Sequence, residues 1–124
     1  MQSRLPGNVL IVAGPRNFFD REVISDALID AIIDLDISKI ITGDAPGVDT
    51  ITAELCTQSS MEYERYFADW DKYGKSAGPR RNWNMAISAT HLLAFYKQPY
   101  GTPGTCNMIY FAERHDLIVK IFNI

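Results

Sequence analysis

Short apolar runs alternate with longer amphipathic segments along the chain. The first run, NVLIVAG at residues 8–14, is continuous, rich in β-branched residues and ends at glycine. This pattern is typical of a strand that is buried on both faces of a parallel sheet. Similar runs predict further strands at residues 39–43, 61–67, 91–96 and 117–122.

The segments between these runs carry apolar residues at helical spacing. Asp20 can cap a helix in which apolar residues recur from position 23 to 35. Further helices are predicted at residues 51–56, 79–89 and about 106–114. Strands that alternate with helices favour right-handed crossovers, with helices on both faces of the sheet. We therefore expect an α/β fold: a single Rossmann-like three-layer sandwich with a mainly parallel sheet, in one domain over residues 1–124.

This fold places several loops on one rim. In such a sheet, ligands bind outside the carboxyl ends of the strands. The loops that follow Ala13, Thr42, Phe67 and Tyr96 should share that rim, and they hold many of the glycines and basic residues of the chain. These loops are therefore the candidates for a ligand site.

The composition limits the kinds of molecule that the protein is expected to bind. The chain has 124 residues, is 47% hydrophobic and 22% charged, and has a formal net charge of -3. A protein that binds duplex nucleic acid usually carries a broad positive footprint, so long nucleic acid is disfavoured. The two cysteines, the absence of a signal-peptide pattern and the absence of a long apolar run predict a cytoplasmic protein without a membrane partner.

The loop GDAPGVD at residues 43–49 is a candidate phosphate site. It places Gly43 and Gly47 between a strand and a helix, with Asp44 beside the first glycine. Glycine permits backbone conformations that aim several N–H groups inward, and a helix start adds partial positive charge. The alternative is a tight turn in which Asp49 caps the helix.

The loop GPRNF at residues 14–18 adds a cation to the same rim. Gly14 opens the loop and Arg16 follows directly after the first strand. A guanidinium group can hold a phosphate with two parallel hydrogen bonds. The alternative is a surface arginine paired with Asp20 or Glu22, but the position on the rim favours a ligand.

The segment YFADWDKYGKSAGPRRNWNM at residues 66–85 mixes aromatic rings, cations and glycines. Aromatic faces could stack on a purine, the cations could hold phosphate, and glycines let the chain bend closely around a ligand. These residues are Trp70, Tyr73, Gly74, Lys75, Gly78, Arg80 and Arg81. Asp69 could accept hydrogen bonds from ribose hydroxyls. A solvated loop would explain the charges but not the aromatic residues and glycines among them.

The loop YGTPGT at residues 100–105 is a second glycine-rich entry to a helix. With the hydroxyls of Thr102 and Thr105, it could hold another phosphate. Cys106 could act as a nucleophile at the helix start, but no histidine has an obvious position as its base. Three aspartates at positions 26, 30 and 34 follow the polar face of the first helix, which favours a solvated surface over a metal site. We expect neither a metal nor a cofactor.

Four ordered motifs carry a resemblance to a known family. AGPRNFFD, TGDAPGVD, FADWDKYGKSAGPRRNWNM and YGTPGT resemble the motifs of the YspA-type, YpsA-related branch of the SLOG superfamily. This Rossmann-like superfamily includes the Lonely guy enzymes and the DNA-processing protein DprA. The resemblance implies a site for nucleotides or nucleotide-derived ligands. It carries into that site Arg16, Gly43, Gly47, Asp49, Trp70, Gly78, Arg81, Asn82, Gly104 and Thr105.

The sequence departs from the family pattern at three informative positions. Asp44 and Thr102 stand where glycine is usual, and Met108 stands where Lonely guy enzymes carry a glutamate. Methionine can neither stabilise an oxocarbenium ion nor orient water, so one of the site aspartates would have to replace that carboxylate. The catalytic residues are therefore unknown from sequence.

These observations favour a binding protein over an enzyme. We expect it to hold a small phosphate-bearing ligand, ADP-ribose-like or a cyclic nucleotide, either as a sensor or by sequestration. The alternative is a Lonely-guy-like phosphoribohydrolase that cleaves the bond between base and ribose. Binding of single-stranded nucleic acid is disfavoured because the basic residues cluster in one segment. A homo-oligomer is expected from the size of the fold.

Overall fold

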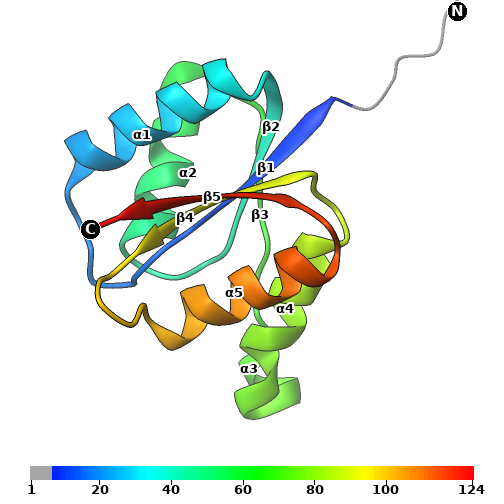
Figure 1. The fold of residues 1–124 in the computed structure, drawn as a ribbon. Helices are drawn as coiled ribbons and strands as arrows, with labels where there is room; N and C mark the ends of the chain where they lie inside the picture. Colours follow the sequence, from blue (N-terminus) through cyan, green and yellow to red (C-terminus); the bar gives the residue numbers. More distant parts are fainter. Residues whose placement is uncertain (1–6) are drawn as a thin grey trace, which may run out of the picture.

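The computed structural model describes residues 7–124, so residues 1–6 of the predicted domain lie outside the described part. Its five-stranded sheet is entirely parallel, in the order β3-β2-β1-β4-β5 (Figure 1). The strands are β1 (Asn8–Ala13), β2 (Ile37–Thr42), β3 (Tyr63–Arg65), β4 (His91–Tyr96) and β5 (Ile118–Asn123). The predicted α/β fold with a parallel sheet is confirmed.

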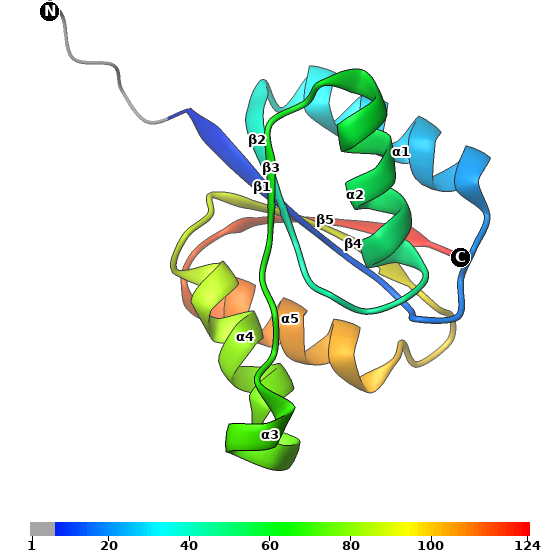
Figure 2. The same cartoon turned by 180° about the vertical axis from the view of Figure 1, so that it is seen from behind.

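Helices cover both faces of this sheet. One face packs against α1 (Arg21–Asp34) and α2 (Val48–Ser59), and the other against α4 (Ala77–Ala86) and α5 (Pro103–Arg114) (Figure 1). The short helix α3 (Trp70–Tyr73) and the 3₁₀ turn η1 (Gly74–Ser76) precede α4, and α3 projects at one end of the molecule (Figure 2). Within residues 7–124, none of these helices is long and apolar enough to cross a membrane.

Each face of the sheet has its own hydrophobic core. Leu10 and Val12 of β1 are buried in the core that includes α1 and α2, whereas Ile11 and Ala13 are buried in the core that includes α4 and α5. Successive side chains of a strand point to opposite faces, so every one of these residues meets apolar neighbours. Burial of one large aliphatic side chain stabilises a fold by about 1.5–3 kcal/mol. The uninterrupted apolar run of β1 follows from its central place.

The helix starts agree with the sequence in part. Asp20 caps α1 as predicted, because its carboxylate accepts a hydrogen bond of 3.2 Å from the N–H of Val23. However, α4 begins before Pro79, and α5 begins directly after Thr102. Glycine disfavours helix, and one glycine lies in each of these first turns, so helix propensity does not predict these two helix starts. The signal at α5 was a β-branched cap residue followed by proline at the first helical position.

The segment between β3 and α4 also differs from the expectation. The predicted strand at residues 61–67 forms only over Tyr63–Arg65, at the edge of the sheet. The residues that follow were expected as loop, but they form α3 and η1. Asp69 accepts a hydrogen bond of 3.1 Å from the N–H of Lys72 and so caps α3. A single turn of helix is too short for apolar periodicity to show in the sequence.

The strand order creates a crevice at the carboxyl end of the sheet. After β1 the chain turns through α1 to β2 on one side, whereas β4 lies on the other side of β1. The connections after β1 and β4 therefore leave the sheet toward opposite faces. Ligands of open parallel sheets bind at such a switch point.

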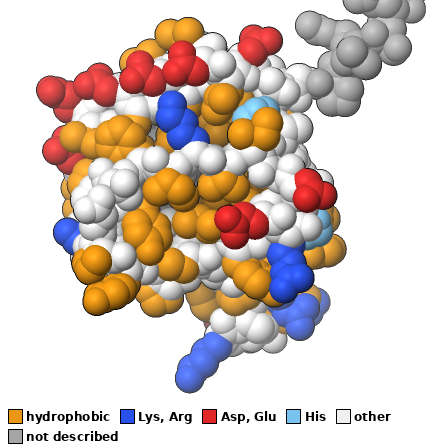
Figure 3. Space-filling view, in the orientation of Figure 1, with side chains coloured by type: hydrophobic (Ala, Val, Ile, Leu, Met, Phe, Trp, Pro, Cys, Tyr) orange, Lys and Arg blue, Asp and Glu red, His pale blue; other side chains and the backbone are white. Residues whose placement is uncertain are grey.

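Charged side chains are unevenly distributed over the surface. Acidic side chains gather along α1, whereas Lys and Arg side chains gather around α3 and α4 at the other end of the molecule (Figure 3). The acidic row includes the exposed Asp26, Asp30 and Asp34. Residues 7–124 contain no group of three His, Cys, Asp or Glu side chains that could hold a metal ion.

Candidate ligand-binding site

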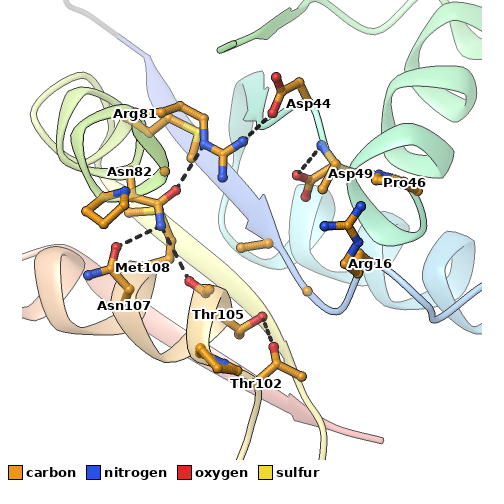
Figure 4. A pocket seen from close by; sticks show the side chains of 18 of the residues that line it. Arg16, Asp44, Pro46, Asp49, Arg81, Asn82, Thr102, Thr105, Asn107 and Met108 are labelled. Atoms are coloured by element: carbon orange, nitrogen blue, oxygen red, sulfur yellow. Dashed lines mark hydrogen bonds and ion pairs between the residues drawn. The ribbon is translucent and has the colours of Figure 1, made fainter. Parts of the chain in front are cut away.

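A pocket of about 670 Å³ lies at the switch point between β1 and β4. Small-molecule sites usually have volumes of about 300–1,000 Å³. Its lining comes from the end of β1, the loop before α2, the first turns of α4 and the first turns of α5. In Figure 4, Arg16 and Asp49 lie on one side, and Arg81, Asn82 and Asn107 lie on the other. The pocket therefore joins both helical layers of the fold.

Arg81 of α4 is held by an aspartate from the opposite wall. Its Nη1 donates to Oδ1 of Asp44, and its Nε donates to the side-chain oxygen of Asn82 over 3.2 Å. Asp44 uses its second carboxylate oxygen to accept from the N–H of Ala68 over 3.2 Å. The side chains of Arg81 and Asp44 are only 13% and 20% exposed. This ion pair is thus largely shielded from water, unlike an ordinary surface pair.

Asn82 connects α4 to α5. Its amide nitrogen donates to the side-chain oxygen of Asn107 over 2.9 Å and to the carbonyl oxygen of Gly104 over 3.4 Å. Its own oxygen accepts from Arg81, so every polar atom of this buried amide has a partner. The network fixes the Arg81 side chain relative to the first turns of α5.

Gly43 and Gly47 shape the loop that carries Asp44. A side chain at Gly43 would place Cβ 2.7 Å from an oxygen of Asp49 and 2.9 Å from Nη1 of Arg81. Gly47 has a φ of +74°, and Cβ there would lie 2.6 Å from the carbonyl oxygen of Pro15. Both glycines allow close approach within the protein, whereas the sequence suggested that they aim N–H groups at a phosphate.

Asp49 is a buried carboxylate on the pocket wall. It is 6% exposed and accepts a hydrogen bond of 3.2 Å from the N–H of Ala45. Burial raises the pKa of Asp49 to about 6, although the Ala45 N–H and the charge of Arg81 lower it in part. Asp49 is not the cap of α2, since Gly47 holds that position. Its polar contacts are therefore made inside the loop and the pocket.

Arg16 lines the pocket and has no ion-pair partner within residues 7–124. It lies in the connection between β1 and α1 and is exposed. Among residues 7–124, neither Asp20 nor Glu22 forms an ion pair with it. The surface ion pair considered from the sequence is therefore absent from the described part of the chain. The guanidinium group of Arg16 is free to bind an anion in the pocket.

The first turn of α5 lines the pocket and is also open. Thr102 precedes the helix but makes no side-chain cap, and its hydroxyl donates to the hydroxyl of Thr105 over 3.0 Å. Gly104 has no atom within 4 Å of a built Cβ position. The first N–H groups of a helix lack partners within the helix and carry partial positive charge. They can donate to an anion in the pocket.

Trp70 and Tyr73 of α3 have different surroundings. Trp70 lines the pocket, is 55% exposed and packs against Gly78, where Cβ would lie 3.1 Å from the indole ring. Tyr73 lies off the pocket lining, and the guanidinium of Arg80 stacks on its ring at 4.3 Å. Only the tryptophan can offer a face to a ligand in this pocket.

A family model described as the YspA, cpYpsA-related SLOG family matches residues 8–73, which is more than half of the chain. The chain belongs to this family. SLOG membership indicates a Rossmann-like domain that binds nucleotide-related ligands. Neither the curated proteins nor the solved structures gave a match to the chain. The matched part of this SLOG domain includes Arg16, the 43–49 loop and Trp70, whereas α4 and α5 follow it.

The pocket brings together most of the site residues predicted from the sequence. Those on its lining are Gly14, Arg16, Asp44, Asp49, Trp70, Gly78, Arg81, Asn82, Gly104 and Thr105. Gly43 and Gly47 lie behind the lining and shape its loop, as described above. Asp69 caps α3 and Lys75 lies exposed in η1, so neither reaches the pocket.

Sequence reasoning missed part of the lining. Asn107 faces the pocket because it lies one turn after Gly104 on α5, and the predicted start of that helix hid this relation. Asn17 and Pro46 also line the pocket, next to residues that were predicted. Met108 reaches the lining but is 1% exposed and belongs to the core beneath α4 and α5. Cys106 is absent from the lining, and its thiol lies 3.5 Å from the carbonyl oxygen of Tyr100.

Proposed function

We propose that this pocket binds a small nucleotide or nucleotide-derived ligand, ADP-ribose-like or a cyclic nucleotide. One observation supports this most strongly: Arg16, a cation with no acidic partner in the described part of the chain, lines the same pocket as the uncapped first turn of α5. Both features favour a phosphate group, the first by bidentate hydrogen bonds and the second by its N–H groups and dipole.

The rest of the lining suits the other parts of such a ligand. Trp70 offers an exposed indole face on which a base can stack, worth about 1–3 kcal/mol in other proteins. Asp49 and Asn107 can exchange hydrogen bonds with sugar hydroxyls. Sensing and sequestration both require that the ligand leaves the pocket unchanged. The predicted homo-oligomer and cytoplasmic location stay predictions.

The proposal is tested by incubating the purified protein with AMP, NAD, ADP-ribose and cyclic ADP-ribose. Small molecules released by heating are then identified by mass spectrometry, and calorimetry gives the affinity of each. Recovery of one intact nucleotide in stoichiometric amount supports the proposal. Absence of binding to every member of the panel contradicts it.

Two variants locate the phosphate. Arg16→Ala should weaken nucleotide binding by about 2 kcal/mol, roughly 30-fold, because a charge-assisted contact is lost. Lys75→Ala is the matched control, since it removes another exposed cation, one that does not line the pocket. Equal affinities of these two variants would place the phosphate elsewhere.

A phosphoribohydrolase is the second candidate, and one observation favours it. Asp49 is a buried carboxylate on the pocket wall whose pKa is raised to about 6, so it can exchange a proton near neutral pH. It could supply the carboxylate that Met108 cannot. Release of free base and ribose 5-phosphate from AMP, lost in Asp49→Asn but kept in Arg16→Lys, would support this candidate over simple binding.

A further inference from the structure

The charges that line the pocket are unequally available to a ligand. They comprise two arginines and two aspartates: Arg16, Arg81, Asp44 and Asp49. Arg81 is paired with Asp44, whereas Arg16 has no acidic partner among residues 7–124. An anionic group of a ligand can therefore reach one cation without competition, and it meets a carboxylate at the other.

Asp44 is fixed in place rather than free to move aside. One of its oxygens accepts from Arg81 and the other from the N–H of Ala68, which joins the loop before α2 to the segment before α3. Its side chain is 20% exposed. A phosphate that approached Arg81 would have to displace this carboxylate or lie beside it. Like charges in a shielded site repel strongly, so both arrangements are unfavourable.

We propose that Asp44 is a specificity-determining residue of the pocket. It acts as an internal counter-ion to Arg81 and restricts the pocket to ligands that carry their anionic charge at one place, beside Arg16 and α5. A second, separate phosphate is rejected at the Arg81 wall. This inference rests on the proposed function, because it assigns the charge pattern of the same ligand.

The test compares nucleotides that differ by one separate phosphate. Calorimetry measures AMP against adenosine 3′,5′-bisphosphate, and ADP-ribose against ADP-ribose 2′-phosphate. The natural chain should bind the member with the additional phosphate no more tightly than its partner. Asp44→Asn should shift the ratio of affinities at least tenfold toward the additional phosphate. Asparagine is nearly isosteric, and its oxygen can still accept from Ala68.

Two further variants test whether the shift in affinity ratio arises from the pairing of Asp44 with Arg81 and not from a general change in charge. Asp34→Asn removes the same charge from the exposed face of α1, at the opposite rim of the sheet, and should leave the ratio unchanged. In the double variant Asp44→Asn with Arg81→Ala, the shift should disappear because the released cation is gone. Thermal unfolding shows whether each variant folds, and Asp44→Gly replaces Asp44→Asn if that variant does not.

The outcomes are distinct. A natural chain that already prefers the additional phosphate overturns the inference, and so does an Asp44→Asn chain that keeps the natural ratio while it binds AMP or ADP-ribose. A shift that persists without Arg81 also overturns it. If the natural chain binds none of these four nucleotides, and neither NAD nor cyclic ADP-ribose, the proposed function itself has failed. A shift that depends on Arg81 supports the inference.

Discussion

The two arginines of the pocket differ in exposure and in ion pairing. Arg81 is shielded, paired with Asp44 and oriented by Asn82, whereas Arg16 is exposed and has no acidic partner among residues 7–124. Both follow glycine-containing motifs in the sequence, and both were expected to hold a phosphate. The difference shows that the partner of an arginine, rather than its place in a motif, decides whether its charge is available to a ligand.

The largest effect on stability is expected at Gly47, which packs against the backbone of the loop that carries Arg16. Gly47→Ala should lower the free energy of unfolding by about 4 kcal/mol, because a side chain at positive φ is strained and its Cβ would overlap the backbone of Pro15 and Arg16. Urea unfolding checks this value. A loss below about 1 kcal/mol would mean that the loop readily takes another shape.

The next largest effect on stability is expected at Asp49, which lies on the same wall of the pocket as Arg16. Its pKa in the folded protein is about 6, above the ordinary value of 3.8, so the fold favours the protonated form. This stabilisation is complete below pH 3.8 and is lost as the pH rises through about 6. Asp49→Asn should therefore raise the free energy of unfolding by about 3 kcal/mol at pH 8 and by much less near pH 4.

The measurement is urea unfolding of both chains from pH 4 to 8. Asparagine keeps the acceptor for the Ala45 N–H, so the hydrogen bond is matched. A stability difference between the two chains that does not change with pH would contradict the burial argument.

Alanine variants of the two arginines should have smaller effects on stability, and they compare the two residues directly. Arg81→Ala should lower the free energy of unfolding by about 2 kcal/mol, because it leaves the shielded carboxylate of Asp44 without its cation. Arg16→Ala should change it by less than about 0.5 kcal/mol, as for other exposed side chains. Adding Asp44→Asn to Arg81→Ala should restore part of the loss. Equal losses in the two arginine variants would remove the distinction between them.

The smallest expected effect is at Gly104. Alanine there meets no atom within 4 Å and favours helix, so Gly104→Ala should raise the free energy of unfolding by about 0.5 kcal/mol. The added methyl group would occupy the open side of the first turn of α5, and AMP binding should weaken. Thermal unfolding and calorimetry on the same sample measure both changes. An unchanged affinity would place the ligand away from this turn.

The fold was accessible from the sequence because its signals are local. Five apolar runs mark the strands, and Asp20 marks the start of α1. The glycine-rich starts of α4 and α5 were not recognised because glycine has low helix propensity. Here Gly78 receives the indole ring of Trp70, and Gly104 leaves the pocket open. Such tertiary reasons override local propensity and cannot be read from the nearby sequence.

Most residues of the pocket lining could be named from the sequence, but the contacts between them could not. The rim rule brought most of the lining together from loops that are distant in sequence. The pairing of Asp44 with Arg81 joins residues from the two helical layers, and no local pattern announces it. The burial of Asp49 likewise depends on tertiary packing, since the side chains of Asp49 and Arg81 both lie close to Gly43. These contacts, rather than the residue types, distinguish the two arginines.

The uneven surface charge has a kinetic consequence. Acidic side chains gather along α1 at one end of the molecule, and Lys and Arg side chains gather around α3 and α4 at the other (Figure 3). The exposed Lys72, Lys75 and Arg80 belong to the segment of α3, η1 and α4 that also carries the pocket residue Trp70. An approaching anion is repelled at the first end and attracted at the second, which raises the fraction of encounters that begin near the pocket. Salt shortens the range of this field to about 3 Å at 1 M. The association rate of an anion should therefore be highest at low ionic strength.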